Sequence, residues 1–243
     1  MPVLPVQQPA QAPITPQKEI CNYYAPTPLY ALDWNRGAEP ENAFRVAMGS
    51  LVEEPVNKLY VANLSASHLA ESKPQIPDFY TVGEAAVDFP ITKVMWQRYK
   101  AGISDGNLLA TSTDRIKLWR CIGRGRDDIM DEDSGSGKDG APHEVAVLAT
   151  KSHGNGRCGA PLTSFDWNTV DPRILITGSV ETTCSVWDVT TQKLRTQLIA
   201  HDREVYDVGF ITGSLDTFAS VGGDGSVRSF DLRSLEHCSI LYE

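Results

Sequence analysis

The sequence has few of the features expected of a membrane, secreted or metal-binding protein. No stretch approaches the 18 apolar residues of a spanning helix, and residues 1–18 are rich in Pro and Gln, without the charged and apolar regions of a signal or transit peptide. The cysteines are scattered and never form Cys-x-x-Cys, so neither a disulfide framework nor a zinc site is indicated; they are Cys21, Cys121, Cys158, Cys184 and Cys238. We therefore expect a cytoplasmic and nuclear protein with no cofactor, no bound metal and no membrane contact.

Positive charge is also scarce. The 22 Lys and Arg residues are outnumbered by 31 Asp and Glu residues, which gives a formal net charge of -9 over 243 residues. Such a balance argues against broad attraction to nucleic acid or anionic lipid. With 41% hydrophobic residues the chain can still bury a core, and a basic nucleic-acid groove is not expected.

Four segments of the chain share one apolar pattern. Each begins with six residues that are apolar at positions one, four and six, and these stretches are Leu29–Trp34, Ile91–Trp96, Leu162–Trp167 and Val205–Phe210. A second stretch of small and apolar residues follows, then a tight turn and a third stretch that ends at Trp119, Trp187-Asp188 or Phe230-Asp231. Small residues in the second stretch allow neighbouring backbones to approach closely.

The spacing of these segments is typical of propeller blades. Trp167 and Phe210 are 43 residues apart, within the 40 to 45 residues of a four-stranded WD40 blade. Asp224-Gly225 between two apolar stretches predicts a tight hairpin. The pattern predicts an all-β WD40 β-propeller over residues 19–243, with blades near 28–63, 90–120, 160–190 and 201–243.

The earlier spacings are longer and predict insertions. Steps of 62 and 71 residues precede Trp96 and Trp167, and we place loop-like insertions at 65–87 and 123–159. The second is acidic and rich in Ser and Gly, a composition that cannot bury enough apolar surface to offset the entropy of ordering. We expect residues 1–18 and 123–159 to be disordered; an alternative for the acidic insertion is a docking or phosphorylation site.

Two stretches match the Gly-x-Gly-x-x-Gly string of phosphate loops, at 135–140 and 154–159. A dinucleotide loop lies between a buried strand and a helix, whereas the first match lies in the acidic insertion and the second leads directly into a strand. No Gly-x-Ser-x-Gly elbow is present either. No catalytic residues are predicted, and an enzyme is the weaker hypothesis.

Three blocks carry a family resemblance, at 160–168, 196–205 and 224–233. They resemble the Transparent Testa Glabra WD-repeat proteins of plants and their animal and fungal relatives, with the strongest match at 160–243 and a looser one at 19–120. The resemblance implies a non-enzymatic scaffold that links a protein kinase or transcription regulators. The alternative it implies is a substrate receptor of a cullin-type ubiquitin ligase.

The resemblance also assigns roles to particular residues. In WD repeats a His, a Ser or Thr, an Asp and a Trp form a buried hydrogen-bonded chain, and His201, Ser220 and Asp224 match three of these positions. The blade residues identified in this way are Trp119, Trp187, Asp188, His201, Ser220 and Asp224. Glu181 stands where Asp is usual, which puts the turn of that blade in doubt.

Four residues are predicted to contact partners. Phe230-Asp231-Leu232-Arg233 is similar to the Trp-Asp-x-Arg box that docks WD proteins on a cullin-ligase adaptor, with Arg233 as the contact and Asp231 as its orienting partner. A basic residue at this position is also common for structural reasons. Tyr30 and Tyr206 follow the first apolar residue of their inner strands and are expected at one rim, where Tyr favours interfaces, although both could serve blade packing.

The relatives have seven blades, and four are recognised in this chain. An open ring exposes apolar faces worth on the order of 10 kcal/mol, comparable to the stability of a whole domain. Glu19–Tyr24 resembles the strand that completes the last blade in the family. The chain is therefore expected to be truncated.

Overall fold

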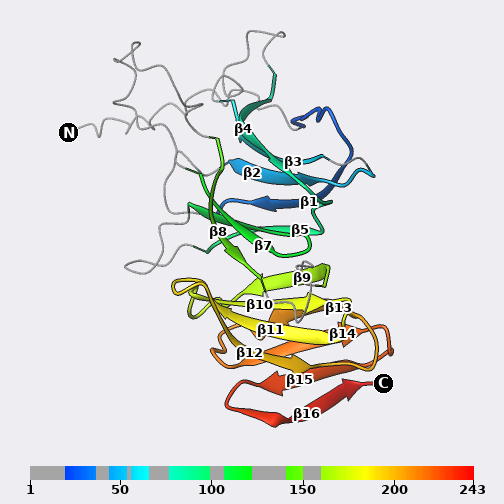
Figure 1. Cartoon of the computed structure of the whole chain (residues 1–243). Coiled ribbons are helices and arrows are strands. Elements are labelled where there is room, and N and C mark those ends of the chain that lie inside the picture. Colours follow the sequence, from blue (N-terminus) through cyan, green and yellow to red (C-terminus); the bar gives the residue numbers. More distant parts are fainter. Residues whose placement is uncertain are drawn as a thin grey trace, which may run out of the picture.

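The computed structural model describes residues 20–36, 44–53, 56–65, 77–98, 107–121, 141–149 and 160–243. These residues form four antiparallel sheets of four strands, here named blades 1 to 4, and contain no helix (Figure 1). In every blade the strands lie side by side in chain order. The predicted fold, an all-β WD40-type propeller with about four blades, is confirmed.

Each blade contains four strands that follow one another in the chain. Blade 1 contains β1 (Leu29–Trp34), β2 (Arg45–Ser50), β3 (Asn57–Leu64) and β4 (Phe79–Val87). Blade 2 contains β5 (Lys93–Trp96), β6 (Leu108–Ser112), β7 (Ile116–Arg120) and β8 (His143–Leu148). Blade 3 contains β9 (Leu162–Trp167), β10 (Ile174–Ser179), β11 (Thr183–Asp188) and β12 (Lys193–Ile199). Blade 4 contains β13 (Val205–Phe210), β14 (Thr217–Gly222), β15 (Val227–Asp231) and β16 (Ser234–Tyr242).

The core lies between the faces of successive blades. Trp96 of blade 2 packs with Leu59 and Val61 of blade 1, and two further clusters fill the next two junctions in the same way. Close packing constrains the backbone: a β-carbon on Gly49 would lie 2.6 Å from Cγ2 of Ile91. The second strands β2, β6 and β10 are buried along their whole length: blades cover both faces of β6 and β10, whereas one face of β2 packs with Tyr23 and Phe79.

Side-chain hydrogen bonds tie the inner strands of neighbouring blades together. Oδ2 of Asp33 accepts the backbone N–H of Trp96 at 2.8 Å, and Oδ2 of Asp166 accepts that of Phe210 at 2.8 Å. Burial raises the pKa of both carboxyl groups, although these N–H donors act in the opposite direction. Each aspartate therefore anchors its own blade to the next one.

The two end blades lie at opposite ends of the stack (Figure 1). Leu32 and Trp34 of blade 1 are 64% and 41% exposed, whereas Trp96 and Trp167, at the same place as Trp34 in the next two blades, are buried. Residues 20–25 form no strand, contrary to the expectation for Glu19–Tyr24, of which Glu19 lies outside the described residues. They are held by individual contacts instead, such as the Tyr23 ring edge-on to Phe79 at 6.3 Å.

The fourth strand of each of the first three blades corrects the predicted blade limits. β4 lies inside the expected insertion at 65–87, β8 lies inside the one at 123–159, and β12 lies beyond the predicted end at 190. Outer strands pair on one side only and carry mixed, partly exposed side chains, so their apolar pattern is weak. Residues 1–18, most of 123–159 and both Gly-rich stretches lie outside the described residues.

Candidate protein-interaction site

Arg233 follows β15 and is held by the carboxylate that ends that strand. Its Nε and Nη2 donate to the two oxygens of Asp231 at 2.9 and 2.5 Å, and its backbone N–H donates to Oδ1 of the same residue at 2.9 Å. The guanidinium lowers the pKa of Asp231 to about 2. The structure thus brings this predicted pair together, with the Arg233 side chain 72% exposed.

A second arginine in blade 3 has the same geometry. Nε and Nη2 of Arg173 donate to the two oxygens of Asp171 at 2.9 and 2.8 Å, and its backbone N–H donates to Oδ1 at 3.0 Å. The hydrogen bonds from Arg173 also lower the pKa of Asp171. These residues lie between β9 and β10, where the sequence analysis assigned no role.

The loop of Arg173 is tied to the β13–β14 loop at the same edge, and Asp216 at the end of that loop lies 3.8 Å from Arg233. Asn168 is fully buried, and its Nδ2 donates to the carbonyls of Ser214 and Leu215 at 3.1 and 3.0 Å. Its Oδ1 accepts the backbone N–H of Asp171 at 2.9 Å. We name this edge of blades 3 and 4 the arginine rim; its residues are Asp171, Arg173, Asp188, Asp216, Asp231 and Arg233.

The two predicted tyrosines lie elsewhere. Tyr30 and Tyr206 are 67% and 56% exposed near the starts of β1 and β13. Because β15 runs parallel to β13 in blade 4, its final residue Asp231 lies at the edge opposite to Tyr206. The hydroxyl of Tyr206 donates to Oε1 of Glu204 at 3.0 Å. The four predicted contact residues therefore lie on two opposite edges.

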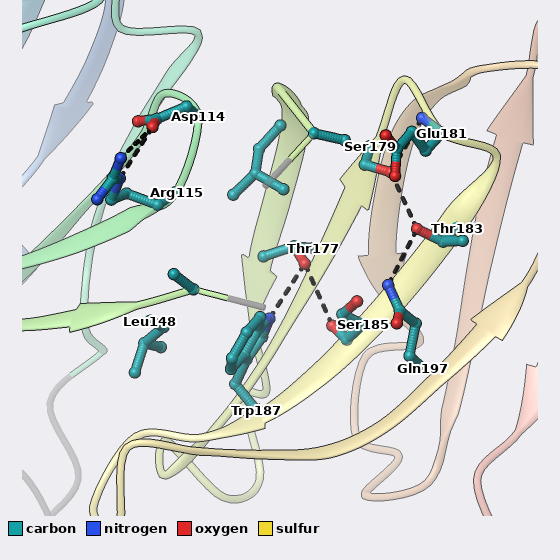
Figure 2. Close-up of a pocket in the computed structure, with 13 residues that line it drawn as sticks. Asp114, Arg115, Leu148, Thr177, Ser179, Glu181, Thr183, Ser185, Trp187 and Gln197 are labelled. Atoms are coloured by element: carbon teal, nitrogen blue, oxygen red, sulfur yellow. Dashed lines mark hydrogen bonds and ion pairs between the residues drawn. The ribbon is translucent and has the colours of Figure 1, made fainter. Parts of the chain in front are cut away.

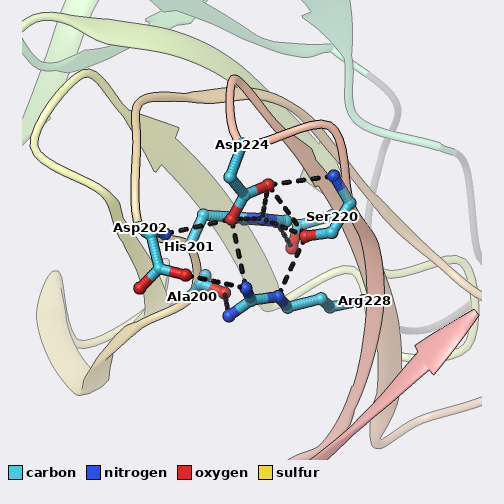
Figure 3. Close-up of polar contacts among 7 residues, drawn as sticks. Ala200, His201, Asp202, Ser220, Asp224 and Arg228 are labelled. Carbon is cyan, nitrogen blue, oxygen red and sulfur yellow. Dashed lines mark hydrogen bonds and ion pairs between the residues drawn. The ribbon is translucent and has the colours of Figure 1, made fainter. Parts of the chain in front are cut away.

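His201, Ser220 and Asp224 do meet, inside blade 4 (Figure 3). Nδ1 of His201 lies 3.0 Å from Oδ1 of Asp224, which can only accept, so in the neutral ring Nδ1 carries the proton and Nε2 accepts the Ser220 hydroxyl at 2.7 Å. Both His201 and Ser220 are buried, so this Ser, His and Asp set stabilises the blade and presents no surface to a substrate.

Arg228 completes this network, although the sequence analysis gave it no role. It donates to Ser226, Asp224, Asp202 and the carbonyl of Ala200 at 3.0 to 3.2 Å (Figure 3). Desolvation would raise the pKa of Asp224. The backbone N–H groups of Asp202 and Ser226, with the Ser226 hydroxyl and His201, outweigh it and hold that pKa well below its usual value.

Blades 2 and 3 contain the Trp and Thr members of the hydrogen-bonded network expected of WD repeats. Nε1 of Trp187 donates to Thr177 at 3.1 Å, and Nε1 of Trp119 donates to Thr111 at 3.0 Å. A pocket between blades 2 and 3 borders the Trp187 and Thr177 pair (Figure 2), with about 350 Å³ of empty space that includes a part open to solvent. Glu181 lies at its edge and contributes its backbone N–H to Ser179.

Three further observations bear on the sequence predictions. Cys121 and Cys184 are buried, which raises the pKa of each thiol to about 12, and Cys158 lies outside the described residues. Within the described ranges no group of three metal-ligating side chains occurs. In the same part of the chain, no helix is long and apolar enough to cross a membrane.

Comparison with known proteins finds similarity to WD-repeat proteins along most of the chain. The chain is 41% identical over 236 residues to a WD repeat-containing protein of Schizosaccharomyces pombe, and the match covers 93% of the chain and 48% of that protein. It is 37% identical over 227 residues to a DDB1- and CUL4-associated factor 7 homolog of Dictyostelium discoideum (93% and 61%). It is 37% identical over 228 residues to a WD repeat-containing protein of Saccharomyces cerevisiae (92% and 40%).

The chain is related to the WD-repeat proteins. It spans about half the length of these relatives, between 40% and 61%. No family model matches the chain.

Asn168 and Arg173 were not predicted from the sequence, for two different reasons. The residue after each inner-strand aromatic is an amide in blades 1 to 3, namely Asn35, Gln97 and Asn168, and all three are buried. Gln97 and Asn168 donate to carbonyls of the following blade. This recurring amide was visible in the aligned segments, whereas the role of Arg173 depends on a loop that no motif marks.

Proposed function

We propose that the chain is a non-enzymatic scaffold of the cytoplasm and nucleus, related to the Transparent Testa Glabra group, that holds partner proteins together. The observation that carries this proposal is the arginine rim. Rigid blades present two exposed guanidiniums there, each held in a fixed orientation by a carboxylate. Fixed and exposed arginines at an edge are suited to binding proteins.

Partner classes follow from the resemblance and from a relative's name. A protein kinase or transcription regulators are the proposed partners of the scaffold. A second candidate function is association with DDB1 and CUL4 as a substrate receptor of a cullin-type ligase, supported by the name of the Dictyostelium relative and by the exposed Asp231–Arg233 pair. Tyr30 and Tyr206 are proposed as contacts on the opposite edge.

Affinity purification tests the proposal directly. The protein is tagged and recovered from its own cells, and partners are identified by mass spectrometry for the wild type and for Arg233→Glu. Recovery of a kinase or transcription regulator by both supports the scaffold, and loss of DDB1 from the variant alone supports the second function. Recovery of no protein partner by the wild type would contradict both.

A further inference from the structure

We propose that Arg173 is a second docking residue, so that the surface that binds DDB1 extends over both blades of the arginine rim. This inference rests on the proposed association with DDB1. The sequence motif marks only Arg233, whereas the structure places a second arginine of the same geometry in the neighbouring blade.

The two arginines occupy corresponding places although they come from different loops. Blades 3 and 4 match with a constant offset of 43 residues, so Asp231 corresponds to Asp188 and Asp216 corresponds to Arg173. In blade 4 the arginine is Arg233, which lies 3.8 Å from Asp216. In blade 3 the arginine comes from the other loop: the backbone carbonyl of Arg173 accepts the N–H of Val189, directly after Asp188, at 2.8 Å. Each blade thus presents a guanidinium beside the end of its third strand.

Each guanidinium keeps donors for a partner. A guanidinium has five N–H groups, and the carboxylate clamp uses one on Nε and one on Nη2. Nη1 and the remaining Nη2 proton of Arg173 and Arg233 are left for carboxylate or carbonyl oxygens. The clamp fixes both side chains beforehand, which lowers the entropy cost of binding.

The loop that carries Arg173 is also held in place, by contacts with the β13–β14 loop and with blade 2. Asn168 bonds Asp171 on one side and the carbonyls of Ser214 and Leu215 on the other, and Gln97 of blade 2 donates to the Pro172 carbonyl at 2.8 Å. Leu215, 41% exposed, provides an apolar contact on the loop that leads to Asp216. The rim therefore suits a partner surface that offers acceptor oxygens to the two guanidiniums and an apolar side chain to Leu215.

Charge complementarity alone does not explain this surface. The arginine rim contains four aspartates and two arginines, so its local charge is not positive. Specific hydrogen bonds from the oriented guanidiniums must then carry the recognition. Consequently Lys should replace Arg173 poorly even though it keeps the charge.

The test measures binding of purified DDB1 to the full chain and to single variants whose melting temperatures are checked first. Arg173→Ala and Arg233→Ala should each weaken binding by roughly tenfold or more, and Arg173→Lys should weaken it by at least threefold. Arg203→Ala is the control, because Arg203 is exposed just before β13, on the edge opposite to the arginine rim, and it should change binding less than about twofold.

Two outcomes would overturn the inference and are distinguishable. If Arg233→Ala weakens binding and Arg173→Ala with an unchanged melting temperature does not, the second docking residue is wrong and the association with DDB1 stands. If the wild type does not bind DDB1, the association itself fails. The scaffold proposal is then judged by the other partners recovered in the affinity purification.

Discussion

The imidazole ring of His201 lies directly against the backbone of Gly222. A β-carbon on Gly222 would come within 2.5 Å of Cγ and Nδ1 of the ring, a distance that real side chains do not adopt. The residues 43 positions earlier are Cys158 and Ser179, so the ring and the glycine are both absent from the corresponding positions of blade 3. The glycine in blade 4 makes room for the histidine.

Gly222→Ala should therefore destabilise the protein. The ring is held by Ser220 on one side and by Asp224 on the other and cannot move freely, so the extra methyl group should cost about 1 to 3 kcal/mol. Chemical denaturation measures this loss. Gly209→Ala is the control, because its nearest neighbour would be 3.9 Å away. Equal effects of the two variants would show that the His201 ring does not restrict the space at Gly222.

Asp224 should make part of the stability depend on acid pH. Its pKa in the folded protein is lower than in the unfolded chain, so its contribution is present above about pH 4 and is lost as the pH falls toward the folded value. Asp224→Asn should be less stable than the wild type at pH 7, and the difference should shrink below pH 4. Urea unfolding at a series of pH values checks this. A difference that stays constant down to about pH 2 would argue against the assignment.

Asp166 should show the opposite pH dependence. Burial raises its pKa, so the folded state binds the proton more tightly than the unfolded chain, and the stability from this group falls as the pH rises through the raised pKa. Asp166→Asn keeps an acceptor for Phe210 without a buried charge and should be at least as stable as the wild type at pH 7. Asp166→Ala loses the acceptor and should cost about 1 to 3 kcal/mol in thermal or urea unfolding. Equal stability of the two variants would contradict an anchoring role.

Trp187 and Thr177 should be energetically coupled. The indole N–H of Trp187 donates to a buried hydroxyl, so Trp187→Phe and Thr177→Val each remove the same bond. A double-mutant cycle should give a coupling of about 0.5 to 1.5 kcal/mol. The pair Trp187 and Thr111, which lie in different blades, serves as the control and should couple by less than about 0.5 kcal/mol.

The repeated inner and middle strands could be predicted from the sequence because they carry a strong and recurring apolar pattern. The roles of Trp119, Trp187, His201, Ser220 and Asp224 were assigned from the resemblance to WD repeats. The outer strands β4, β8 and β12 could not, since one-sided pairing leaves little apolar signal. The proposed role of Arg173 depends on its contact with Asp171 and on the position of their loop beside blade 4. Both follow from packing in the folded chain.

Amide hydrogen exchange of the full chain, alone and with DDB1, tests most directly whether the arginine rim is a protein-binding surface. We expect slower exchange in the bound state at 170–173, 211–217 and 231–234, with little change around Tyr30 and Tyr206. Protection confined to the edge that carries those two tyrosines, or no protection at the arginine rim, would contradict it.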